Sequence, residues 1–84
     1  MPHIIVERSF DPPLTQEDLD SVARRVSDCL ELYRVNWIRS YLSADRRRMV
    51  CEYDAPDAQS VREVQNTAQA RFDRVWPAEV MEPS

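Results

Sequence analysis

The sequence predicts a single α+β domain of the ferredoxin-like kind, a β-α-β-β-α-β sandwich in which two helices cover one face of a four-stranded antiparallel sheet. The first observation behind this prediction is a hairpin pattern at residues 35–54, where aromatic and branched residues flank the polar turn 43–47. The second is a stripe of apolar residues with helical spacing before the hairpin, and the third is a helix start directly after it. Since the chain has 84 residues, we expect one domain over residues 1–84, with a thin core.

The first strand is predicted at residues 3–10 and the first helix from Thr15 to about Tyr33. The strand should end at residues 11–13, because the prolines there have no amide hydrogen to give to a neighbouring strand. Thr15 is the expected N-cap, with Asp18 in the third helical position. The helix should pack on the sheet through one stripe: Leu19, Val22, Ala23, Val26, Cys29, Leu30 and Tyr33.

The second half of the chain should repeat this pattern. Its elements are strands at 35–42 and 48–54, a helix from 57 to about 69, and a last strand at 72–81. Pro56 disfavours a helical conformation at the residue before it, and Asp57 can accept hydrogen bonds from the free amides of the helix that follows. Because Pro77 lies inside the last strand, that strand is expected at an edge of the sheet or at a bulge.

Composition excludes several classes of function. A net charge of −4 argues against general nucleic-acid binding, which needs a cationic face. The chain contains no glycine, so a P-loop and a dinucleotide-binding fingerprint are excluded, and no organic cofactor is implied. No apolar run approaches the roughly 20 residues that span a membrane, and no signal peptide is visible, so we expect a cytoplasmic protein. Cys29 and Cys51 are expected to be reduced, buried thiols.

The two faces of the predicted sheet differ in polarity. One face, with Ile4, Val6, Met49, Cys51 and Tyr53, should lie under the helices. The other face would carry His3, Ile5, Glu7, Val50 and Glu52 from the central strands, with Ile38, Ser40, Trp76, Ala78 and Val80 from the flanks. This mixture is too apolar for water and too polar for a core. We therefore expect a homodimer whose two sheets meet face to face around a barrel-like cavity.

A resemblance to a known family is carried by Val6-Glu-Arg8, Arg39-Ser-Tyr-Leu-Ser43, Cys51-Glu-Tyr-Asp-Ala-Pro-Asp57, Val61-Arg62 and Phe72-Asp-Arg-Val-Trp-Pro-Ala78. These segments resemble a family of small ferredoxin-like proteins of unknown function, also called nickel-binding-protein-like. The resemblance covers nearly the whole chain and is most specific at residues 40–57. It implies a dimeric α+β barrel and, in at least one member, nickel binding. Many members carry a glycine near the end of the second helix, where this chain has residues 66–71 without one.

Nickel binding can be weighed on the ligands that the chain offers. Ni²⁺ prefers imidazole nitrogen, thiolate or carboxylate ligands. His3 is the one histidine; Glu7 shares its strand face, and Glu52 is expected next to it across the central strands. His3, Glu7 and Glu52 are therefore the candidate metal ligands, with a second set supplied by a dimer. The alternative is that a lone histidine near a terminus is only a surface residue.

A second hypothesis is an enzyme that encloses a small organic molecule in the dimer cavity, as isomerases, cyclases or monooxygenases of related fold do. Glu7 and Glu52 would be its acid/base pair, with Tyr41 as a third catalytic candidate. The ligand-binding side chains in this hypothesis are Trp37, Ser40, Tyr41 and Trp76.

A purely structural role for Glu7 is the remaining alternative. In it, Glu7 forms an ion pair with Arg39 or Arg74 across a dimer interface, with no chemistry. A hydrolase triad is disfavoured, because the single histidine lies at the end of the sequence. Residues 46–48 are all arginine, and a charged hairpin turn of this kind is normally just solvated.

Overall fold

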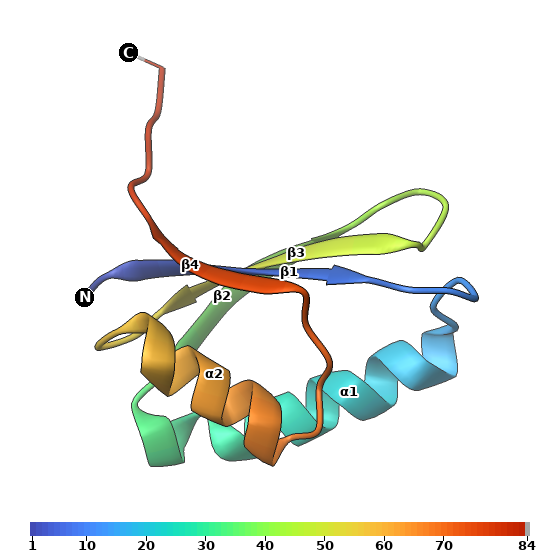
Figure 1. The fold of residues 1–84 in the computed structure, drawn as a ribbon, viewed down its shortest axis with the longest axis horizontal. Coiled ribbons are helices and arrows are strands. Elements are labelled where there is room, and N and C mark those ends of the chain that lie inside the picture. Colours follow the sequence, from blue (N-terminus) through green and yellow to red (C-terminus); the bar gives the residue numbers. More distant parts are fainter. Residues whose placement is uncertain (84) are drawn as a thin grey trace.

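A computed structural model describes residues 1–83 as a four-stranded antiparallel sheet with both α-helices on one of its faces (Figure 1). Along the chain the elements are β1 (His3–Ser9), α1 (Gln16–Cys29), the 3₁₀ helix η1 (Glu31–Tyr33), β2 (Asn36–Leu42), β3 (Arg48–Asp54), α2 (Ala58–Thr67) and β4 (Arg74–Ala78). The strand order is β2-β3-β1-β4. The predicted ferredoxin-like α+β fold is therefore confirmed.

Both helices begin at the predicted caps. The Thr15 side chain accepts a hydrogen bond from the amide of Asp18, and the Asp57 side chain accepts one from the amide of Ser60. The hydrogen bond from the Ser60 amide also holds the pKa of Asp57 below its usual value. The first helix is shorter than predicted, because α1 ends at Cys29 and the chain continues as the separate turn η1.

Among residues 1–83 of this glycine-free chain, three take the left-handed conformation: Arg34, Arg46 and Gln69, with φ of 60°, 61° and 55°. Gln69 ends α2. The amide of Ala70 donates to the carbonyl of Gln65 at 2.9 Å, and the amide of Gln69 donates to that of Asn66 at 3.2 Å. This pair of bonds is a Schellman motif, which usually has glycine at its left-handed position. At this corner a glutamine therefore adopts a geometry that is usual for glycine.

Replacing that glutamine tests how much the corner is strained. A left-handed conformation is unfavourable for a residue with a Cβ atom, so Gln69→Gly should raise the free energy of unfolding by about 0.5–1 kcal/mol. The matched control is Arg24→Gly at an exposed position inside α1, which should lower it by a similar amount. Urea unfolding measures both. A destabilised Gln69→Gly variant would contradict the argument.

The core lies between the helices and the covered face of the sheet. Alternate residues of β1 and β3 point into it, and valines of both helices pack against them. The five residues predicted on this face are all buried: Ile4, Val6, Met49, Cys51 and Tyr53. Both cysteines are free thiols; Cys51 is buried as expected, but Cys29 is partly exposed, so the expected burial of Cys29 is wrong. Within residues 1–83, neither helix has the length and apolar character that crossing a membrane requires.

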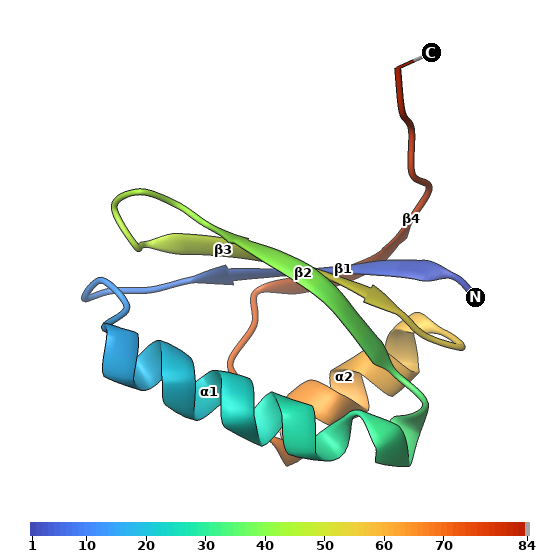
Figure 2. The same ribbon diagram turned by 180° about the vertical axis from the view of Figure 1, so that it is seen from behind.

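Strand β4 lies at an edge of the sheet and pairs only with β1 among the described strands. Pro77 is accommodated there, opposite Ile4, as the prediction required. The strand is shorter than the predicted 72–81, because it ends at Ala78. Residues 79–83 leave the sheet on the side opposite the helices and project away from it (Figures 1 and 2).

A bulge in the other edge strand, β2, changes which of its residues share a face. Trp37 lies opposite Tyr53, but Arg39 lies opposite Glu52, so Ile38 is an extra residue in the ladder. Beyond the bulge, Ser40 lies opposite Cys51 on the helix-covered face. The expectation that Ser40 lies on the other face is therefore wrong.

One charged side chain is buried in the core region. Arg8 continues the inward alternation of Ile4 and Val6 and is only 4% exposed. Its guanidinium donates hydrogen bonds to the Arg71 carbonyl at 2.9 Å, to Gln65 Oε1 at 2.6 Å and to the Tyr53 hydroxyl at 3.4 Å. Arg8 thus links β1 to β3, to α2 and to the segment that precedes β4.

Burial raises the pKa of Tyr53 to about 12. The folded protein therefore holds the phenol proton more tightly than the unfolded chain, whose tyrosine pKa is about 10. This contribution to stability is complete below pH of about 10 and is lost as the pH rises towards about 12. Over that window the free energy of unfolding should fall by of order 2 kcal/mol more in the wild type than in Tyr53→Phe. Urea unfolding at a series of pH values measures this difference, and parallel pH profiles would rule it out.

Candidate functional site on the open face of the sheet

The face of the sheet that no helix of residues 1–83 covers carries a histidine between two carboxylates. His3 Nε2 lies 3.2 Å from Glu52 Oε2, and His3 Nδ1 lies 3.4 Å from Asp54 Oδ1. The antiparallel register of β1 and β3 explains the cluster, because it places His3 opposite Asp54 and Ile5 opposite Glu52. The side chains of His3 and Glu52 are only 16% and 18% exposed. They are thus partly withdrawn from water although they lie on an open face.

Asp54 is the member of this cluster that the sequence analysis did not assign. The signal was present, because the first residue of one strand and the last residue of its antiparallel partner lie side by side. Arg39 approaches the same cluster from β2, with its Nε 3.8 Å from Glu52 Oε2. Glu52 therefore has both the imidazole and a guanidinium as neighbours.

The side chains of this cluster are of types that bind transition metals, but one chain supplies too few of them to hold an ion. An imidazole nitrogen and a carboxylate are ligands that nickel accepts. Asp54, however, approaches the second ring nitrogen of His3, so the two carboxylates flank the ring instead of sharing one nitrogen. Within residues 1–83 no three His, Cys, Asp or Glu side chains are placed to hold one ion. One chain alone supplies a pair of donors.

Glu7, the third predicted metal ligand, makes a different contact. Its Oε2 accepts a hydrogen bond from the indole Nε1 of Trp76 on β4, at 2.7 Å. Arg74 lies opposite Glu7 in the register, but no ion pair involving Glu7 forms within residues 1–83. Arg39, the other arginine considered for Glu7, approaches Glu52 instead. An ion pair of Glu7 across a dimer interface stays a prediction.

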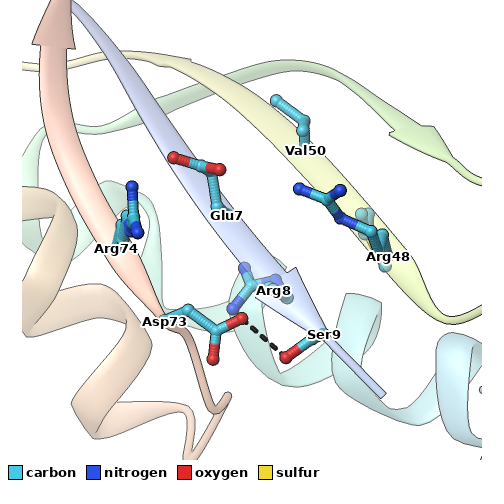
Figure 3. A pocket seen from close by; sticks show the side chains of 8 residues that line it. Glu7, Arg8, Ser9, Arg48, Val50, Asp73 and Arg74 are labelled. Carbon is cyan, nitrogen blue, oxygen red and sulfur yellow. Dashed lines mark hydrogen bonds between the residues drawn. The ribbon is translucent and has the colours of Figure 1, made fainter.

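A shallow pocket of about 410 Å³ surrounds Glu7 at the other end of the open face. Figure 3 shows the Glu7 side chain on β1 between Arg74 on β4 and Arg48 on β3. At the lower end of the pocket the hydroxyl of Ser9 donates to Asp73 Oδ2 at 2.7 Å (Figure 3). The open face therefore has its imidazole at one end and two arginines around a carboxylate at the other.

The four predicted ligand-binding residues are divided between the two faces. Trp37 stacks against Tyr53 on the helix-covered side, with ring centroids 6.2 Å apart, and its indole donates to the Ser40 hydroxyl at 2.9 Å. Tyr41 lies opposite Val50 and Trp76 opposite Ile5, both on the open face. Tyr41 is 54% exposed and Trp76 is 43% exposed. These two, from opposite edges of the sheet, are the candidates that the open face presents.

Comparison with known proteins assigns the chain to a family. The model of a family described as "Nickel responsive protein SCO4226-like" matches residues 5–78. The chain belongs to this SCO4226-like family. A similar solved structure is that of SCO4226 from Streptomyces coelicolor A3(2), with a TM-score of 0.84 and 14% sequence identity over 95% of this chain and 99% of that chain. At this identity the likeness shows the fold. No curated protein matches the chain.

Membership in the SCO4226-like family confirms the resemblance that the sequence segments carry. The family description speaks of nickel response, which is a statement about the family. The acid/base role predicted for Glu7, Glu52 and Tyr41 stays a prediction.

The bond between Trp76 and Glu7 can be tested with an internal control. Glu7→Gln replaces a charge-assisted hydrogen bond by a neutral one, so the indole proton of Trp76 should move upfield in the ¹H–¹⁵N spectrum. The indole of Trp37 donates to an uncharged hydroxyl on the opposite face, and its signal should stay in place. A Trp76 signal that does not move in the variant would show that this bond is absent in solution.

Proposed function

We propose that the protein is a homodimer that binds nickel, or a similar divalent transition metal, on the open face of its sheet. The observation that carries the proposal is the half-buried pair of His3 and Glu52, which presents a nitrogen and a carboxylate on an uncovered face. Membership in a family described as nickel responsive supports the choice of metal. His3 Nε2 and the Glu52 carboxylate would hold the ion, and Glu7 would take no part because Trp76 binds it.

The shortage of donors in one chain makes a second copy part of the proposal. Two ligands do not complete the coordination of a divalent transition metal, and further donors have to come from another chain or from water. A two-fold axis through the open face would bring a second imidazole and a second carboxylate to the same surface. Dimer formation and metal binding should then support each other.

The composition of the open face favours a second copy as its cover. The face combines the exposed rings of Tyr41 and Trp76 with side chains of both charges: Glu7, Arg39, Arg48, Glu52 and Arg74. A surface with both signs of charge can complement itself across a two-fold axis. The segment 79–83 projects on the same side, and its Val80 and Met81 are 60% and 91% exposed. Such side chains would find apolar contacts on a partner.

Native mass spectrometry and calorimetric titration with Ni²⁺ test the proposal on protein without a histidine tag. The wild type should appear as two chains that bind nickel saturably. His3→Ala and Glu52→Gln should each weaken binding at least tenfold, since each removes a ligand. Glu31→Gln removes a carboxylate from the exposed turn η1 and should bind nickel as the wild type does.

Two results would overturn this function. A monomer at micromolar concentration would contradict the dimer, and a wild type that binds no nickel, or binds it equally well without His3, would contradict the metal site. A dimer that binds no metal would leave the cavity enzyme, with Glu7 and Glu52 as its acid/base pair, as the hypothesis to test next.

A further inference from the structure

A second cavity lies mainly on the helix side of the sheet, where the end of β1 meets α1, and it shares Arg8, Ser9 and Asp73 with the Glu7 pocket. It has a volume of about 540 Å³ and is enclosed by the connection from β1 to α1, by α1 itself and by the segment before β4. This volume is within the range of pockets that bind small molecules. Three arginines line it: Arg8, Arg25 and Arg71.

Arg8 is a buried cation whose charge no described residue balances. All three of its hydrogen bonds go to uncharged acceptors: a carbonyl, an amide oxygen and a hydroxyl. Within residues 1–83 no carboxylate lies within 4 Å of its guanidinium. Buried charges in proteins are normally paired, because removal from water penalises an isolated charge heavily. Arg8, a residue that is 4% exposed, therefore lacks a negative charge to balance its guanidinium.

The neighbour of Arg8 lacks the same kind of partner. Gln65 is fully buried; its Oε1 accepts from Arg8, and its Nε2 has no hydrogen-bond partner among the described residues. Turning the amide over would place its NH₂ donor against the Arg8 donor, so the orientation with Nε2 unpartnered is favoured, and the group that Nε2 lacks is an acceptor. Gln65 lines an adjoining cavity of about 370 Å³ that shares Gln69, Arg71 and Phe72 with the first. A positive charge without an anion and a donor without an acceptor thus lie side by side.

Arg25 is fixed at the α1 wall of this cavity. Its Nε donates to the Ala68 carbonyl at 2.8 Å and one terminal nitrogen donates to the Ser21 hydroxyl at 2.6 Å. These bonds hold the guanidinium in place without neutralising it. The acidic residues of the lining are Asp11, Asp18 and Asp73; Asp11 pairs with Arg47, and Asp73 accepts from the Ser9 hydroxyl. None of the three forms an ion pair with a lining arginine.

We propose that this cavity binds a small molecule that carries a carboxylate or phosphate group, with Arg8 as the buried charge that selects the anion and Arg25 and Arg71 as its partners at the wall. The oxyanion would supply the negative charge that the Arg8 guanidinium lacks. The inference does not depend on nickel binding, because neither His3 nor Glu52 lines this cavity.

The test is a ¹H–¹⁵N titration of the metal-free full chain with inorganic phosphate and, separately, with citrate, at constant ionic strength set with sodium chloride. Saturable shifts are expected at the amides of residues 69–73 and at the Arg25 side chain. A response to phosphate alone would favour a phosphate ligand, and a response to citrate alone would favour a carboxylate. Arg25→Gln should weaken binding at least tenfold. Arg24→Gln removes the adjacent exposed arginine, which does not line the cavity, and should leave binding unchanged.

Arg8 itself is tested by a variant that keeps the charge. Arg8→Lys removes the planar guanidinium, so it should weaken anion binding in a chain that circular dichroism shows to be folded. Shifts that never saturate with either probe, or equal losses in Arg24→Gln and Arg25→Gln, would overturn the proposal. Arg8 would then be only a structural link between β1 and α2. Nickel binding would be unaffected by that result, so the two proposals fail separately.

Discussion

The antiparallel register between β1 and β3 is the constraint on which the rest of the structure depends. It pairs His3 with Asp54 at one end and Ser9 with Arg48 at the other. Because side chains alternate along a strand, this single register places Ile4, Val6, Met49, Cys51 and Tyr53 under the helices. It equally places the histidine and the carboxylates on the open face. A slip by one residue would exchange the two faces and bury the carboxylates, so packing of the core also fixes the geometry of the candidate site.

Sequence reasoning predicted the features that local signals determine. Thr15 and Asp57 cap their helices through contacts three residues apart, and the edge position of β4 follows from the chemistry of Pro77. It did not predict the bulge in β2, because no glycine or proline marks it. The bulge shows itself only in the pairing with β3, where Trp37 stacks on Tyr53. The misplaced Ser40 follows directly from that missed bulge.

At the candidate site, too, the sequence predicted what one strand determines and missed what depends on pairing between strands. The alternation of β1 placed His3 and Glu7 on one face, but the partners of each come from other strands. His3 meets Glu52 and Asp54 on β3, whereas Glu7 meets Trp76 on β4. Two residues on the same strand face therefore differ in their contacts: His3 lies between two carboxylates, and Glu7 accepts a hydrogen bond from an indole. The pairing partners, which the sequence leaves open, decide which contacts each side chain makes.

Strand β1 carries an incomplete set of metal donors on one side of the sheet and a cation without a counter-charge on the other. At its start, the open face offers two donors where a metal requires more. Near its end, the covered side holds a guanidinium that lacks an anion. His3 and Arg8 are five residues apart in sequence, which corresponds to about 16 Å along a strand. The hydrogen-bond and ion-pair partners of Arg8 and of His3 do not overlap among residues 1–83, and at such a separation the effects of changes normally add. A change at His3 could therefore affect Arg8, or the reverse, only through the packing of β1, the strand that carries both residues.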